Sequence, residues 1–267
     1  LILEAVFMLL PIGFSFIYGE EIWWIYLLCA ALSFVAGYGL KNLRVSNKNM
    51  YAKEGLVAVS ASWIVISLVG TLPFVISGAI PNFIDALFET VSGFTTTGAT
   101  ILTDVEVLPK SLLFWRSFTH WIGGMGVLVF LVSILKLSGS NNIYLLKAES
   151  TGPTVGKIVP RVQSSAKILY VIYSALTLTE IVLLLLGGMK PFDAITLSLG
   201  TAGTGGFAVL NSGLTAYTSY QQVVITVFML LFGIDFSFYF LFIARKGKEA
   251  IKMEEVRAYL LIILTAT

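Results

Sequence analysis

The sequence predicts an all-α polytopic membrane protein built from repeated units, each a span, a re-entrant helix, a polar strip and a second span. Apolar residues make up 57% of the 267 residues and charged residues only 12%, about half the charged fraction of a soluble domain. The apolar residues form runs that reach the roughly 20 residues a helix needs to cross a bilayer. Two strips rich in Gly and Thr interrupt these runs at corresponding places.

Several classes of function are excluded at this stage. Cys29 and His120 are the single cysteine and histidine of the sequence, so the usual ligand set of a zinc site is missing. No nucleophile elbow, phosphate loop or dinucleotide fingerprint is present. We therefore expect no enzyme, no transition metal, no organic cofactor and no nucleic-acid partner.

The apolar runs give the expected organisation in chain order. They fall at about 1–18, 22–40, 55–80, 111–137, 166–189 and 221–244, and a seventh begins near Ala258. We predict two leading transmembrane helices in 1–40, a first repeat unit in 41–137, a second in 138–257 with the flanking cytoplasmic loops, and the truncated start of a third unit in 258–267.

Basic residues predict the topology. Most Lys and Arg residues lie in the stretches 41–53, 136–167 and 245–257, and the positive-inside rule assigns all three to the cytoplasm. An even number of crossings must then separate neighbouring stretches. The intervening segments 81–110 and 190–220 must begin and end outside, which predicts that each enters the membrane and returns.

Both segments contain a short helical pattern followed by a polar strip: "NFIDALFETVSGF" then "TTTGAT", and "PFDAITLSLG" then "TAGTGGF". An offset of 108 residues places Asp85 on Asp193, Thr96 on Thr204 and Gly98 on Gly206. Non-helical backbone at membrane depth is tolerated where it is buried in protein or lines a wet cavity. The repeat therefore predicts an ion site between the two units.

The chemistry of the strips favours a cation. Backbone carbonyls can replace the hydration shell of a monovalent cation when several strands surround one axis. Glycine permits the backbone conformations that such a strand needs, and the C-terminal end of the preceding helix carries partial negative charge. The alternative is that Thr and Gly only allow close helix packing, as small residues do in membranes.

The motif "FETVSGFTTTGAT", followed by "WRSFTHWIGGMGVLVF", resembles the first pore unit of the Trk/Ktr/HKT superfamily of potassium transporters, most nearly the bacterial TrkH-type subunits. The strip "GTGGF" is similar to the second pore unit. The resemblance implies a potassium-channel-like fold with four filter strands around one pore, two of them in this chain. It implies K⁺ at the filter residues Thr95, Thr96, Thr97, Gly98, Gly203, Thr204, Gly205 and Gly206.

The function that the resemblance implies is the pore-forming subunit of a potassium uptake system in the plasma membrane. Its implied partners are membrane lipid, a second copy in a homodimer and a cytosolic nucleotide-binding regulatory subunit. The filter loops are expected to face outside. Other readings remain open: a sodium-coupled or sodium-permeable transporter of the same fold, a non-conducting membrane scaffold, and two such chains that together complete one pore.

Charged residues within apolar runs are functional candidates. Arg116 is expected either to pair with Glu89 and brace the filter or to snorkel to the outer interface. Asp235 and Glu180 are each expected to line a cavity below the filter or to lie as hydrogen-bonded acids between helices.

Three polar residues outside the strips have competing interpretations. His120 is either a packed, hydrogen-bonded residue or a proton relay. Asp104 and Glu106 either concentrate cations at the pore mouth or are ordinary loop charges.

Overall fold

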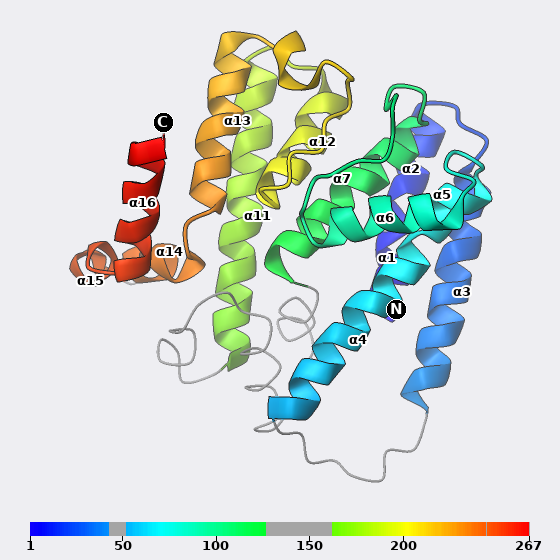
Figure 1. Ribbon diagram of the computed structural model, residues 1–267, viewed down its shortest axis with the longest axis horizontal. Coiled ribbons are helices and arrows are strands. Elements are labelled where there is room, and N and C mark those ends of the chain that lie inside the picture. The colour runs from blue at the N-terminus through cyan, green and yellow to red at the C-terminus, as the bar shows by residue number, and fades with distance from the viewer. Residues whose placement is uncertain (43–51, 127–161, 244, 267) are drawn as a thin grey trace.

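The computed structural model describes residues 1–42, 52–126, 162–243 and 245–266, and helices joined by loops make up these ranges (Figure 1). The chain opens with the short helices α1 (Ile2–Phe7) and α2 (Leu10–Ile17), followed by α3 (Trp23–Lys41). Pro11 lies in the first turn of α2, where its ring would clash with the carbonyl of Phe7 if one helix continued. The first apolar run is therefore a broken helix.

The first unit contains α4 (Ala52–Gly70), α5 (Leu72–Ile76), α6 (Phe83–Phe94) and α7 (Lys110–Met125). The end of α5 and the start of α7 lie toward the upper side of Figure 1, while the start of α4 lies at the lower side. Between them α6 runs across the view and the chain returns upward. This is the re-entrant course that the loop charges predicted.

The second unit repeats this arrangement with α11 (Val162–Leu186), α12 (Pro191–Ala202), the 3₁₀ helix η1 (Gly213–Ala216) and α13 (Ser219–Phe232). The re-entrant helices α6 and α12 are both 12 residues long, and their first and last residues are related by the offset of 108 found in the sequence. The predicted fold class, with its repeated units, is confirmed.

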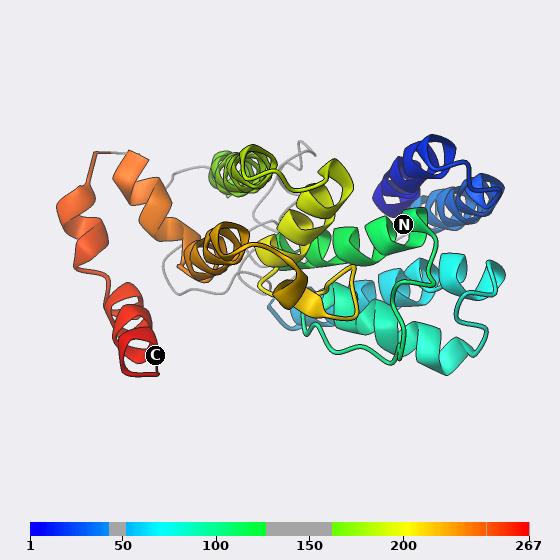
Figure 2. The ribbon, with the colours of Figure 1, turned by 90° about the horizontal axis from the view of Figure 1, so that it is seen from above.

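Helix α7 is the central element of the described part. It packs against both re-entrant helices, α6 and α12, and from above it lies near the middle of the molecule (Figure 2). Trp115 fixes its position, because its indole Nε1 donates a 3.0 Å hydrogen bond to the carbonyl of Gly70. The ring of Trp115 is fully buried and meets Phe94 of α6 edge to face.

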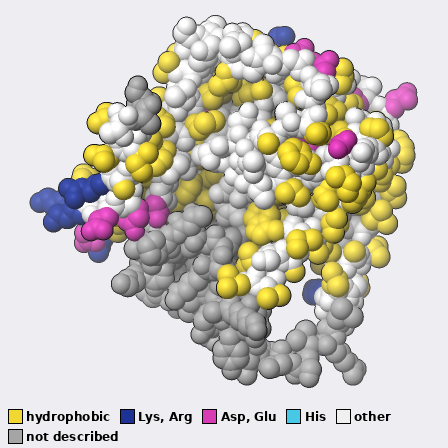
Figure 3. Space-filling model, in the orientation of Figure 1, with side chains coloured by type: hydrophobic (Ala, Val, Ile, Leu, Met, Phe, Trp, Pro, Cys, Tyr) yellow, Lys and Arg dark blue, Asp and Glu magenta, His cyan; other side chains and the backbone are white. Residues whose placement is uncertain are grey.

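The lipid-exposed character of the fold is visible on its surface. Hydrophobic side chains spread over much of the face in Figure 3, and charged side chains gather beside α15 (Gly247–Ile251). Three helical stretches are long and apolar enough to cross a membrane: Trp23–Lys41, Leu56–Ile76 and Lys167–Leu186. These features describe a multi-pass membrane protein.

The run at 221–244 was expected to be one span, and in the structure it is two helices joined by a bend. Helix α13 ends at Phe232, and α14 (Phe236–Ile243) continues at an angle of 86°. Gly233 is the C-cap of α13, and the carboxylate of Asp235 accepts a 2.7 Å hydrogen bond from the amide of Ser237. An Asp that caps the first turn of the next helix favours a break in the run despite its hydropathy.

Other predicted boundaries differ less. The run at 111–137 corresponds to α7, which ends at Met125 because Gly126 takes a left-handed φ of 76°; residues 127–137 lie outside the described ranges. Most of the basic stretches 41–53 and 136–167 also lies outside them. The third basic stretch contains α15 and the first turn of α16 (Glu254–Ala266).

Candidate functional site

The two polar strips begin with the same backbone turn. At the end of α6 the amide of Thr97 donates to the carbonyl of Ser92, and that of Thr96 donates to Gly93. At the end of α12 the corresponding bonds run from Gly205 to Gly200 and from Thr204 to Thr201. Both pairs form a Schellman motif, in which the second residue after the helix is left-handed.

That left-handed position is occupied by threonine in both strips. Thr96 has a φ of 55° and Thr204 a φ of 54°. A β-branched residue at positive φ is rare and strained, and glycine is the usual choice there. Two residues further on, Gly98 and Gly206 are also left-handed, with φ of 73° and 85°. Each strip therefore contains two left-handed residues and is not a plain extended strand.

The carbonyl groups of the two strips point to a ligand site. Among the residues that the structure describes, no hydrogen bond reaches the carbonyls of 95–98 or of 203–206. Most residues of the two strips are exposed or half-buried, so these carbonyls are open to water or to a ligand. Such oxygen atoms are the ligands that a dehydrated monovalent cation needs.

The two strips touch each other and α7. A Cβ atom on Gly98 would collide with the carbonyl oxygen of Gly205, so these backbones are in contact. On α7, Gly123 abuts the carbonyl of Phe94, and Gly124 lies 2.9 Å, measured from an ideal Cβ, from the Cα of Gly203. The tandem glycines thus let one helix approach the ends of both re-entrant helices, which is the packing role expected of small residues in membranes.

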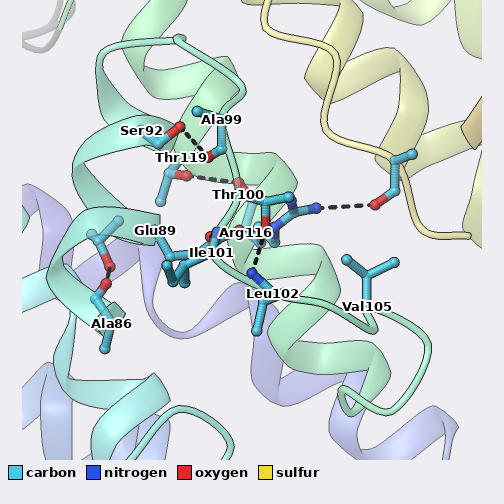
Figure 4. Close-up of polar contacts among 12 residues, drawn as sticks. Ala86, Glu89, Ser92, Ala99, Thr100, Ile101, Leu102, Val105, Arg116 and Thr119 are labelled. Atoms are coloured by element: carbon cyan, nitrogen blue, oxygen red, sulfur yellow. Dashed lines mark hydrogen bonds and ion pairs between the residues drawn. The ribbon is translucent and has the colours of Figure 1, made fainter. Parts of the chain in front are cut away.

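Glu89 organises the first strip (Figure 4). Its carboxylate accepts hydrogen bonds of 3.0 Å from the hydroxyl of Thr100 and of 3.1 Å from the amide of Ile101. One turn further along α6, the hydroxyl of Ser92 donates a 2.6 Å bond to the carbonyl of Ala99. The returning chain is therefore fastened to the helix that precedes it.

Arg116 lies against the same carboxylate. Its Nε is 2.5 Å from Oε1 of Glu89, and both side chains are almost fully buried. Its Nη1 donates a 3.0 Å hydrogen bond to the carbonyl of Ala208, just beyond the second strip. Of the two interpretations of Arg116, the structure shows the ion pair and not snorkelling, and the guanidinium also joins the two units.

The remaining buried candidates are placed as follows. Glu180 is completely buried between helices, and neither carboxyl oxygen is hydrogen-bonded to a described residue. His120 is also fully buried, and its ring nitrogens likewise make no hydrogen bond within the described part; it was expected to be hydrogen-bonded. Asp235 lies at the bend between α13 and α14 instead of mid-span, and is half-buried.

The loops that follow the two strips are joined by Asn211. Its side-chain oxygen accepts from the amide of Val105 at 2.8 Å, and its side-chain nitrogen donates to Asp104 at 2.7 Å. Its own amide donates to Glu106 at 2.9 Å. Asp104 and Glu106 thus bind a residue of the other unit. No motif in the sequence marked Asn211, and only the fold brings it there.

This contact predicts a pH dependence. The hydrogen bond from Asn211, and next the amide of Glu106, hold the pKa of Asp104 below its ordinary value of 3.8. A depressed pKa contributes stability that is present above the ordinary value and lost as the pH falls through the folded-state pKa. We expect Asn211→Ala to move the pKa of Asp104 up toward 3.8 in an NMR titration of labelled aspartate carboxyls. An unchanged titration would contradict the contact.

The amide groups at the start of α7 are capped by a residue that the sequence did not single out. Glu20, in the loop before α3, accepts hydrogen bonds from the amide of Lys110 at 2.5 Å and from that of Ser111 at 3.2 Å. A carboxylate at a helix N-terminus is favourable because it satisfies unpaired amides and meets the positive end of the helix dipole. The leading helices therefore help to position α7.

Known proteins resemble this chain along nearly its whole length. The family described as "TrkH: Cation transport protein" matches residues 26–265. The Trk system potassium uptake protein TrkH of Vibrio parahaemolyticus is 39% identical over 218 residues, 79% of this chain and 45% of that protein. The corresponding protein TrkG of Escherichia coli is 34% identical over 267 residues, 98% of this chain and 55% of that protein.

The crystal structure of the potassium transporter TrkH from Vibrio parahaemolyticus superimposes with a TM-score of 0.75 at 31% identity, covering 98% of this chain and 54% of that one. The chain thus spans about half the length of the relatives it matches. The resemblance inferred from the pore motifs is confirmed. Because the family match includes both re-entrant helices, both strips and α7, the chain belongs to the TrkH family of cation transport proteins.

Proposed function

We propose that this chain provides part of the pore of a potassium uptake system, with K⁺ held by backbone carbonyls of residues 95–98 and 203–206. The observation that carries the proposal is the pair of strips whose carbonyls accept no hydrogen bond within the described residues. Both strips follow short helices whose C-terminal ends favour a cation. The names of the two relatives given above, both potassium uptake proteins of Trk systems, agree with this substrate.

The ion pair between Arg116 and Glu89 supports the filter in this proposal. Glu89 fastens the first strip to α6, and Arg116 extends the link to Ala208 after the second strip. A buried ion pair of this kind fixes geometry when further hydrogen bonds satisfy its remaining atoms. Asp235, near the inner end of α13, is proposed to face the path of the ion, where a carboxylate attracts cations.

The arrangement in the cell is part of the same proposal. The three basic stretches face the cytoplasm and the strips open outward, in keeping with the positive-inside rule. The whole protein forms a homodimer and is controlled by a cytosolic nucleotide-binding subunit. The support for a regulatory partner is that the relatives are named as components of Trk systems.

Ion flux through the full-length protein tests this function. We expect vesicles that contain the protein to take up Rb⁺, and K⁺ to compete with this uptake far better than Na⁺, because the carbonyl cage replaces the hydration shell of the larger ion. Empty vesicles are the control. Uptake of Na⁺ in place of Rb⁺ would favour a sodium transporter of the same fold, and no cation flux would favour a membrane scaffold.

A further inference from the structure

The second strip lacks the support that the first strip receives from its own helix. In the first unit, Ser92 holds the carbonyl of Ala99, and Glu89 binds the next two residues. The offset of 108 places Gly200 at the position of Ser92 and Leu197 at that of Glu89. Gly200 has no side chain and the side chain of Leu197 cannot form a hydrogen bond, so α12 cannot fasten its strip in this way.

Two side chains from α7 of the first unit take over this task. His120 stacks on the ring of Phe207, with centroids 4.0 Å apart and an angle of 28° between the planes. One turn earlier, the guanidinium carbon of Arg116 lies 3.5 Å from the centroid of the same ring. Phe207 directly follows Gly206 and is almost fully buried, so α7 holds the residue at which the second strip ends.

His120 also touches the strip itself. An ideal Cβ on Gly205 would lie 2.5 Å from both Cε1 and Nε2 of the histidine ring. Gly205 is not left-handed, so its lack of a side chain is explained by the ring beside it and not by its backbone conformation. The carbonyl of His120 lies equally close to Gly203, 2.6 Å from an ideal Cβ there.

We infer that His120 is a positioning residue for the second filter strip, and that it acts as a rigid aromatic wall. The inference rests on the proposed function, because the strip must be a filter for its position to matter. The ring stacks on Phe207 and fills the space beside Gly205, so it acts through its shape. The register of the second strip is thereby set by the first unit.

Substitutions at His120 in the full-length protein test the role, with Rb⁺ uptake and its inhibition by Na⁺ as the readout. We expect His120→Ala to lower the preference for Rb⁺ over Na⁺ by about tenfold, equivalent to about 1.4 kcal/mol. His120→Phe, which keeps an aromatic ring, should stay within about twofold of the unsubstituted protein, since each twofold is only about 0.4 kcal/mol. Equal losses in both variants would overturn the inference.

A matched control separates this role from general destabilisation. Phe118 is a buried ring on the same helix, but it packs against Phe7, Phe114 and Trp121 and not against the strip. Phe118→Ala should lower the melting temperature in detergent and leave the Rb⁺/Na⁺ preference unchanged. A change of preference in Phe118→Ala as large as in His120→Ala would also overturn the inference.

A double variant tests directly whether His120 and Gly205 are in contact. Gly205→Ala alone should disturb selectivity, because its methyl group meets the histidine ring. In the double variant the ring is absent, so Gly205→Ala should add no further loss to that of His120→Ala. Additive losses would contradict a contact between the two sites. If the unsubstituted protein carries no cation, the proposed function fails; if it does and only these results fail, the inference alone is wrong.

Discussion

Gly98→Ala is expected to abolish selective Rb⁺ uptake. Gly98 has a left-handed φ of 73°, and a Cβ there would collide with the carbonyl oxygen of Gly205 in the neighbouring strip. The backbone strain alone costs about 1–2 kcal/mol. The collision is with another main chain, which cannot move aside as a flexible side chain can, so the substitution displaces one of the proposed ligands.

Gly206→Ala is the matched control, because it separates strain from collision. Gly206 is also left-handed, with a φ of 85°, but a Cβ there meets no atom within 4 Å. Rb⁺ uptake by the Gly206→Ala protein should therefore be weakened less than uptake by the Gly98→Ala protein. Both variants are compared by Rb⁺ uptake and its inhibition by Na⁺, with the amount of protein in the membrane measured in parallel. Unchanged uptake and selectivity in Gly98→Ala would refute the filter assignment.

Arg116→Gln should be the most destabilising change outside the strips. Both partners of the ion pair are buried, and removal of one leaves the other charge unpaired, at a cost of about 3–5 kcal/mol. The change also removes the bond to Ala208. We expect a large fall in the melting temperature in detergent and a reduced preference for Rb⁺ over Na⁺.

Two comparisons sharpen the test of Arg116. The exposed pair between Lys246 and Glu249 should contribute at most about 1 kcal/mol, so Lys246→Gln should leave stability and transport nearly unchanged. The double variant Arg116→Gln with Glu89→Gln should lose less than the sum of the two single variants, because no unpaired charge remains. Equal effects of Arg116→Gln and Lys246→Gln would exclude a bracing role.

The sequence predicted the features that have a local or periodic cause. The offset that aligned Asp85 with Asp193 also aligns α6 with α12, because a repeated unit must repeat its helices. The pairing of Arg116 with Glu89 was among the predictions because a charge in an apolar run needs a partner. The bend after Phe232 was missed although Gly233 and Asp235 signalled it, since hydropathy over the long run outweighed two local residues.

The contacts between the two units depend on tertiary packing and could not be predicted from local or periodic features of the sequence. His120 meets Gly205 and Phe207 only after α7 has packed between the two re-entrant helices, and Asn211 reaches Asp104 across more than 100 residues of chain. The sequence shows that neither Leu197 nor Gly200 offers a hydrogen-bonding side chain. Only the structure shows that the second strip is supported from its other side, by α7.

The bend between α13 and α14 has a consequence for the surrounding bilayer. Helix α13 has 14 residues, so at 1.5 Å per residue it is about 21 Å long, against a hydrocarbon layer of about 30 Å. With Ser219 at one boundary of this layer, the helix stops about 9 Å short of the other. The turn with Asp235 then lies within the apolar layer, and such hydrophobic mismatch is relieved when lipid thins locally. The membrane beside this second unit is therefore expected to be thinner than elsewhere around the protein.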